Sequence, residues 1–165
     1  MTGDLQLKGN IMLEMGKYDE ARALYERSLK MTEDSSLSQQ IKDNAKLFQH
    51  YNLARVALGK KDLATARTEA EDFRQGTEAK NNPVQMKQAH QLIGMIALAA
   101  KEYDKAVSEL QQANQQNPYD LYRLCQAYQG KGDATQAKEF CKKAANFNSL
   151  PAVNYAFIRR RAAKV

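Results

Sequence analysis

Apolar residues recur along much of this chain every three to four positions, which is the spacing of a helix that buries one face. The clearest stretch runs from Lys101 to Pro118 and is closed by an Asn-Pro pair. Its apolar and small positions are Tyr103, Ala106, Val107, Leu110 and Ala113. Three weaker copies of this stretch occur elsewhere in the chain. The pattern therefore predicts a protein built from several similar amphipathic helices.

The same spacing, read from end to end, predicts nine helices and no convincing strand. Glycines, capping residues and two Asn-Pro pairs separate the helices, and the total of eight glycines and three prolines suits a helical chain. The expected helices are 4–15, 18–31, 37–58, 62–75, 83–100, 101–118, 120–132, 134–148 and 152–164. The polar segment GTEAKNN before Pro83 is expected to be a loop.

The even-numbered helices align on one alanine each, which we call the marker alanine. The four markers are Ala21, Ala66, Ala106 and Ala137, at spacings of 45, 40 and 31 residues. A small residue lies twelve positions before each marker, in the preceding helix: Gly9, Ala54, Gly94 and Cys125. The chain thus repeats a helical hairpin, and such units must stack on their neighbours to bury their apolar faces.

These hairpins resemble tetratricopeptide repeats. The resemblance is strongest at 87–118, good at 121–144 and 5–29, and weaker at 50–73. In the strongest repeat the matching residues are Ile93, Gly94, Ala97, Tyr103, Ala106, Leu110, Ala113 and Pro118. Four tandem matches are far more specific than one, because the family pattern is degenerate.

The resemblance implies an all-α fold, an α-solenoid of stacked antiparallel helix pairs. We expect one domain over 1–165, with about four repeats at 3–33, 37–78, 83–117 and 118–149 and a capping helix at 152–164. The usual unit has 34 residues. The longer spacings therefore imply extra length at 32–46 and 76–86, which we expect to lengthen the first helices.

The resemblance also implies a non-enzymatic scaffold that binds a peptide or protein partner in a concave groove lined by the first helix of each repeat. Amides, arginines and tyrosines at groove positions suit hydrogen bonding to peptide groups and carboxylates. Carried over by repeat position, the groove residues are Gln6, Asn10, Tyr51, Asn52, Arg55, Gln91, Met95, Tyr122, Arg123 and Gln126. The alternative is that these are merely solvated polar positions.

Some family members grip a partner's C-terminal carboxylate with five conserved Lys, Asn and Arg positions. Asn10 and Asn52 match two of them. The other three positions hold Gln6, Gln88 and Leu92, which cannot supply the missing positive charges. Binding of chaperone tails in that manner is therefore not expected.

The formal charge of +6 is unevenly distributed. Residues 1–80 hold 13 basic and 13 acidic side chains, whereas residues 81–165 hold 12 basic and 6 acidic ones. The sharpest basic cluster is 159–161 with Lys164. This half could attract nucleic acid or another polyanion, which is the alternative function. The irregular repeat spacing argues against it, because helical RNA-binding repeats usually hold a regular period.

Candidate chemistry is sparse. His50 and His90 occupy the same repeat position and are expected to have packing roles, so neither a metal nor a cofactor is expected. Cys125 and Cys141 would lie on facing helices, where a disulfide is possible but two small buried thiols are the simpler interpretation. The carboxylates Glu69, Glu71 and Asp72 are expected to form a solvated helical face, matched by nearby Arg67 and Arg74. No catalytic triad or phosphate-binding loop is recognisable. The protein is therefore not expected to be an enzyme.

The compartment and the assembly state stay open. No apolar run approaches a membrane span, and the first ten residues do not resemble a signal peptide. Lys8, at a position that is usually apolar, and the abrupt start of the first helix suggest a regulatory or assembly module of a larger protein that could be exported. Such a chain would be cytoplasmic, or exported with its leader removed. Self-association through the repeat ends is possible.

Overall fold

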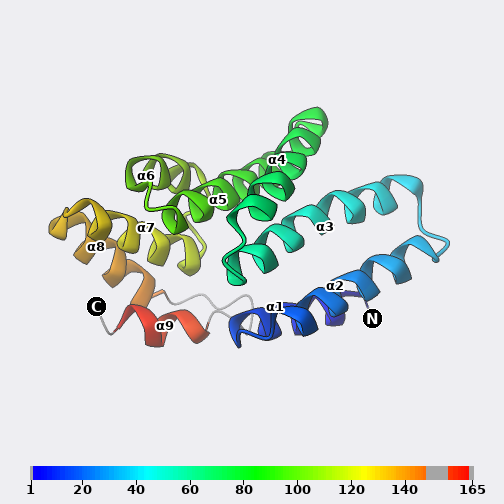
Figure 1. The fold of residues 1–165 in the computed structure, drawn as a ribbon, viewed down its shortest axis with the longest axis horizontal. Helices are drawn as coiled ribbons and strands as arrows, with labels where there is room; N and C mark the ends of the chain where they lie inside the picture. Colours follow the sequence, from blue (N-terminus) through cyan, green and yellow to red (C-terminus); the bar gives the residue numbers. More distant parts are fainter. Residues whose placement is uncertain (1, 148–155, 164–165) are drawn as a thin grey trace. The chain divides into compact units, whose positions relative to one another are not determined.

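The computed structural model describes residues 2–147 and 156–163, and within them the chain forms nine α-helices and no strand (Figure 1). The helices are α1 (Thr2–Glu14), α2 (Tyr18–Glu33), α3 (Gln39–Gly59), α4 (Leu63–Lys80), α5 (Pro83–Ala99), α6 (Tyr103–Gln112), α7 (Pro118–Lys131), α8 (Ala134–Ala145) and α9 (Ala156–Ala162). The expectation of an all-α fold is confirmed. No helix in the described ranges is both long and apolar enough to cross a membrane.

The helices fall into two compact units, Met1–Asn82 and Pro83–Val165. We call them the N-terminal unit and the C-terminal unit. In the N-terminal unit consecutive helices pack on one another: α1 on α2, α2 on α3 and α3 on α4. In the C-terminal unit the same order holds from α5 to α9, with added contacts of α7 to α5 and α9. Short turns within each pair make its helices antiparallel.

The marker alanines lie at the centres of the helix pairs. Ala21, Ala66 and Ala106 have no exposed surface, and Ala137 has almost none. In the C-terminal unit Ala106 and Ala137 belong to one apolar cluster with Leu110 and Leu124. The markers are therefore close-packing positions, as the repeat predicts, and not helix filler.

Several predicted boundaries are confirmed with a physical cause. Asp62 and Asn117 cap α4 and α7, since their side chains accept hydrogen bonds from the backbone N–H groups of Thr65 and Tyr119. Gly16 ends the first helix with a positive φ of 77°, a conformation that glycine adopts without a steric penalty.

The segment 76–82 was expected to be a loop, and this is wrong for residues 76–80. Helix α4 continues through Gly76 to Lys80 and ends at Asn81, which adopts the left-handed conformation. Gly76 is a packing position, because a Cβ there would overlap the side chain of Leu47 on α3. The extra length at 32–46 does lengthen a first helix, α3, whereas the extra length after residue 75 mainly lengthens the second helix, α4.

The simpler interpretation of the cysteines is also wrong. Cys125 on α7 and Cys141 on α8 form a disulfide with a Cα–Cα distance of 5.1 Å. Both residues are buried between the two helices of the fourth pair. The disulfide was the alternative that the hairpin geometry left open.

The capping helix is shorter in the described residues than predicted. It is observed over Ala156–Ala162, while 152–155 and Lys164 of the predicted range lie outside the described residues. Ile158 and Ala162 of α9 pack with Tyr119, Leu121 and Ala144 in one apolar cluster. Helix α9 thus covers the end of the fourth pair, as a cap would. The expectation of one domain over 1–165 stays a prediction.

Candidate functional site

In the N-terminal unit, side chains of the first helices α1 and α3 hydrogen-bond directly to each other. Asn52 donates from Nδ2 to Gln6 Oε1 at 3.0 Å, and Arg55 donates from Nη1 to Asn10 Oδ1 at 2.8 Å. The same Asn10 oxygen accepts from the Tyr25 hydroxyl at 2.9 Å. We call these residues, with Tyr51, the α1–α3 array. The structure therefore brings together five of the residues predicted to bind a peptide.

Arg55 has a defined orientation in this array. Its guanidinium carbon lies 5.3 Å from the centre of the Tyr51 ring, a cation–π arrangement one helical turn apart. The Tyr51 ring is itself fixed between Phe48, stacked at 5.0 Å, and Phe73, tilted at 5.5 Å. Burial raises the pKa of the Tyr25 hydroxyl, which therefore stays a neutral donor to Asn10. The array is built on side chains that have little freedom to move.

The C-terminal unit holds a related array on α5 and α7. Asp120 Oδ1 accepts from Gln91 Nε2 at 2.6 Å and from Arg123 Nη1 at 2.9 Å. The Arg123 guanidinium lies 5.5 Å from the Tyr119 ring centre. We call these four residues the α5–α7 array. Each unit therefore carries an arginine that is placed over a tyrosine and bonded to an acceptor.

Asp120 is fully buried, and sequence reasoning did not identify it. Desolvation by burial raises the pKa of its carboxyl, against the opposing effects of Arg123 and Gln91. Its Oδ2 has no hydrogen-bond partner, and neither does the buried Oδ1 of Asn52. An acid in the first turn of a helix is usually exposed and stabilised by the helix dipole, which is why the sequence gave no signal of burial.

The remaining predicted groove residues take part in neither array. Met95, Tyr122 and Gln126 are partly buried. Tyr122 packs against the apolar cluster that α9 closes. These three stay predictions as contact residues.

The second and third hairpins each contain a His–Glu pair that joins their two helices, and the two pairs occupy the same repeat positions. His50 Nδ1 lies 2.7 Å from Glu69 Oε2, and His90 Nδ1 lies 2.8 Å from Glu109 Oε2. Both pairs have a sequence separation of 19 residues. Each histidine lies 16 residues before a marker alanine and each glutamate three residues after it, so the repeat alignment contains the signal for both pairs.

The second hairpin adds a third group to its pair. Asp72, one turn after Glu69 on α4, places Oδ2 at 3.9 Å from His50 Nδ1. In the part of the chain that the structure describes, His50, Glu69 and Asp72 form the one group of three side chains whose ligand atoms all lie within 4.8 Å of one another.

A second repeated contact, which we call the clasp, joins a Tyr-Asp pair to a Gly-Lys pair on the next first helix. Tyr103 packs over Gly130, where a Cβ would overlap the ring, and Lys131 Nζ pairs with Asp104 at 2.6 Å. In the N-terminal unit the clasp consists of Tyr18, Asp19, Gly59 and Lys60. The corresponding positions of the second and third repeats hold Leu63, Ala64, Ala99 and Ala100.

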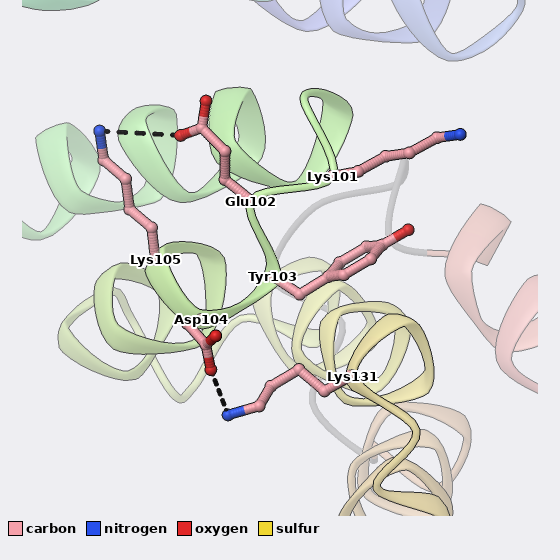
Figure 2. Close-up of a pocket in the computed structure, with 6 residues that line it drawn as sticks. All are labelled: Lys101, Glu102, Tyr103, Asp104, Lys105 and Lys131. Atoms are coloured by element: carbon pink, nitrogen blue, oxygen red, sulfur yellow. Dashed lines mark ion pairs between the residues drawn. The ribbon is translucent and has the colours of Figure 1, made fainter.

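The clasp of the C-terminal unit borders an open hollow of about 500 Å³. Figure 2 shows its side chains: Asp104 reaches Lys131, while Lys105 turns away to Glu102 at 4.0 Å. The N-terminal clasp has the same tyrosine, aspartate and lysine. It lacks the other two lysines of the hollow, because Gly16 and Glu20 stand where the C-terminal unit has Lys101 and Lys105. The hollow is therefore best explained by the joint between α6 and α7, and we assign it no ligand.

Comparison with known families identifies a match over three parts of the chain. A family model described as tetratricopeptide repeat matches three segments, 5–35, 87–120 and 121–149, which together cover more than half of the chain. The three segments correspond to the first, third and fourth hairpins. The second hairpin, with its lengthened helices α3 and α4, lies between the matched segments. No curated protein matches the chain significantly in sequence.

Proposed function

The chain belongs to the tetratricopeptide repeat family, and from this premise we propose that it is a non-enzymatic interaction module that binds a peptide segment of a protein partner on its first helices. Repeats of this family generally mediate protein–protein interaction. The finer proposal is that the α1–α3 array and the α5–α7 array are each, within their own unit, a contact surface for such a peptide.

The observation that carries the proposal is the fixed position of one arginine in each array. Arg55 is held by Asn10 and lies over Tyr51, and Arg123 is held by Asp120. A guanidinium presents its donors in a rigid plane that matches carboxylates and peptide carbonyls. Because its side chain is already ordered, binding costs less conformational entropy than it would for a mobile arginine.

The competing explanation is that the polar side chains only join neighbouring first helices. Under that explanation, replacing an arginine would change stability but no binding property. The two explanations therefore separate in a binding experiment with variants that keep the helix contacts.

The test begins with a peptide library of known sequences, screened against the full chain, followed by titration of a selected peptide. Arg55→Gln and Arg123→Gln keep a donor for Asn10 and Asp120 but lose the charge and the planar fork. We expect at least one of these variants to lower the affinity for the selected peptide by tenfold or more, which is about 1.4 kcal/mol of binding free energy. Arg22→Gln is the matched control, because Arg22 lies exposed on the second helix α2 and bonds only locally to Glu26 among the contacts described.

Equal binding by wild type and all three variants would remove the arrays from the proposal. Failure of every library peptide to bind would count against the peptide-binding function itself. Thermal unfolding of each variant shows whether a loss of binding reflects a loss of fold.

A second function, binding of nucleic acid through the C-terminal unit, is favoured by one observation. Helices α8 and α9 pack together and expose six cationic side chains: Lys138, Lys142, Lys143, Arg159, Arg160 and Arg161. Some of this charge is engaged locally, as Lys143 is with Glu139 at 2.6 Å. The function predicts an affinity that falls steeply with salt. A mobility-shift assay at low ionic strength that shows no complex with RNA or DNA would exclude it.

A further inference from the structure

We propose that His50, Glu69 and Asp72 form a binding site for a divalent transition-metal cation of the zinc type on the N-terminal unit. His50 Nδ1 lies 2.7 Å from Glu69 Oε2 and 3.9 Å from Asp72 Oδ2. Small movements of these side chains would place all three atoms around a cation, since zinc bonds to nitrogen and oxygen at about 2.0–2.2 Å.

The set of ligands suits this class of cation. A neutral imidazole and two carboxylates supply three protein ligands, the number typical of zinc sites that keep an open position for water. The side chains of His50, Glu69 and Asp72 are 40%, 20% and 50% exposed, so water has access to the remaining position. The two carboxylates also give the cluster a negative charge that attracts a dication.

The helices hold these groups in place. Glu69 and Asp72 are three residues apart on α4, a spacing that puts both carboxylates on one face. His50 lies on α3, which packs against α4, and its side chain reaches both carboxylates. The cation would replace the hydrogen shared by His50 and Glu69, and it would link two rigid elements.

The third hairpin provides a natural comparison. It repeats the His–Glu pair as His90 and Glu109, but Gln112 stands at the position that Asp72 occupies in the second hairpin. A His–Glu hydrogen bond alone is thus explained as a contact between helices. The added carboxylate of Asp72 distinguishes the second hairpin. The proposal therefore predicts that a metal cation binds at His50 and not at His90.

The experiment is a titration of the untagged full chain with zinc chloride. Binding is measured by isothermal titration calorimetry and by NMR of the imidazole nitrogens. The chain has two histidines, so each ring resonance is assigned by one substitution. Both cysteines are in the disulfide, so no thiol competes for zinc. We expect one equivalent to bind, with large shifts of the His50 ring and little change at His90.

Two variants make the test specific. Asp72→Asn removes the carboxylate that is the third ligand, as in the third hairpin, and should weaken zinc binding by more than about tenfold. Loss of a residue that only hydrogen-bonds to a metal ligand already costs about tenfold, and loss of a ligand should cost more. Gln112→Asp should add a second site, with new shifts at His90. Both changes are at exposed positions, and circular dichroism shows whether the helices persist.

Equal shifts of both histidines in wild type would overturn the proposal, because the third ligand would then be irrelevant. The absence of binding at millimolar zinc would overturn it as well. An unchanged affinity in Asp72→Asn would remove Asp72 from the site and leave only a generic His–Glu contact.

Discussion

Cys125 and Cys141 are joined across the fourth helix pair at a sequence separation of 16 residues. The same separation relates Gly9 to Tyr25 in the first pair and Gly94 to Leu110 in the third. In those pairs the glycine leaves room for the large residue: a Cβ on Gly94 would lie 2.6 Å from Leu110 Cγ. The fourth pair fills the same pair of positions with a covalent bond.

Removing this bond is predicted to destabilise the C-terminal unit. A cross-link that closes a loop of about 15 residues lowers the entropy of the unfolded chain by the equivalent of about 3 kcal/mol. We expect Cys125→Ala with Cys141→Ala to lose that amount of unfolding free energy. Alanine is suitable because Ala54 and Ala70 are buried at the same positions of the second pair. Hydrogen exchange of the α7 and α8 amides measures the loss.

The N-terminal unit serves as the internal reference, since exchange of the α3 and α4 amides should not change. Reduction of the wild type should reproduce the exchange of the double variant. If two thiols of the unreduced wild type react with an alkylating reagent, or if reduction leaves exchange in α7 and α8 unchanged, the prediction is contradicted.

Two glycines of α1 are predicted to respond to alanine with opposite signs. Gly9 lies against the buried Tyr25 ring, whereas Gly3 has no atom within 4 Å of an added Cβ. Gly9→Ala should destabilise the protein by about 1–3 kcal/mol through overpacking. Gly3→Ala should stabilise it by up to about 1 kcal/mol through helix propensity. Urea unfolding of both variants gives the comparison, and equal signs would refute the packing explanation.

The clasp of the C-terminal unit is predicted to depend on its packing and not on its ion pair. Gly130→Ala should displace the Tyr103 ring and cost about 1–3 kcal/mol of unfolding free energy. Asp104→Asn should leave stability unchanged within error, because Asp104 is 89% exposed and its pair with Lys131 lies in water. Chemical denaturation of the two single variants distinguishes these effects. A larger loss of unfolding free energy in Asp104→Asn than in Gly130→Ala would show that the ion pair, and not the packing, stabilises the clasp.

The repeat pattern was sufficient to predict the helix pairs, because each pair buries a marker alanine and the small residue twelve positions before it. It failed at Gly76, where a glycine that usually ends a helix instead makes room for Leu47. Local propensity cannot distinguish a glycine needed for a turn from one needed for a close approach. Only the partner across the helix pair decides between them.

The candidate sites were less predictable, because they depend on side chains that meet between helices. Repeat positions placed Asn10, Asn52 and Arg55 on first helices, but they did not indicate that Asn52 and Arg55 donate hydrogen bonds to side chains of α1. Asp120 was missed, because burial of an acid follows from tertiary packing. The grouping of Asp72 with His50 required the relative rotation of α3 and α4, which periodicity alone does not fix to a few ångströms.

Asp120 gives a prediction about pH. Burial raises the pKa of its carboxyl, so the folded chain binds this proton more tightly than the unfolded chain, whose Asp pKa is about 3.9. The stabilising contribution is therefore fully present below about pH 3.9 and is lost as the pH rises through the folded-state pKa. We compare the wild type with Asp120→Asn, which does not titrate. The unfolding free energy of the wild type minus that of the variant should increase as the solution is acidified from pH 8 to about pH 4.

Asp62 is the control of opposite sign for this experiment. Hydrogen bonds from the Thr65 side chain and backbone lower the pKa of its carboxyl, so its contribution is present at neutral pH and is lost as the pH falls through the folded-state pKa. In Asp62→Asn the helix cap is kept, because asparagine caps as well as aspartate does. The wild type minus Asp62→Asn difference should therefore change little between pH 8 and about pH 4 and decrease only at lower pH, whereas the Asp120 difference already increases above pH 4. A wild type minus Asp120→Asn difference that falls on acidification would show that the Asp120 carboxylate is stabilised by Arg123 and Gln91 more than burial penalises it.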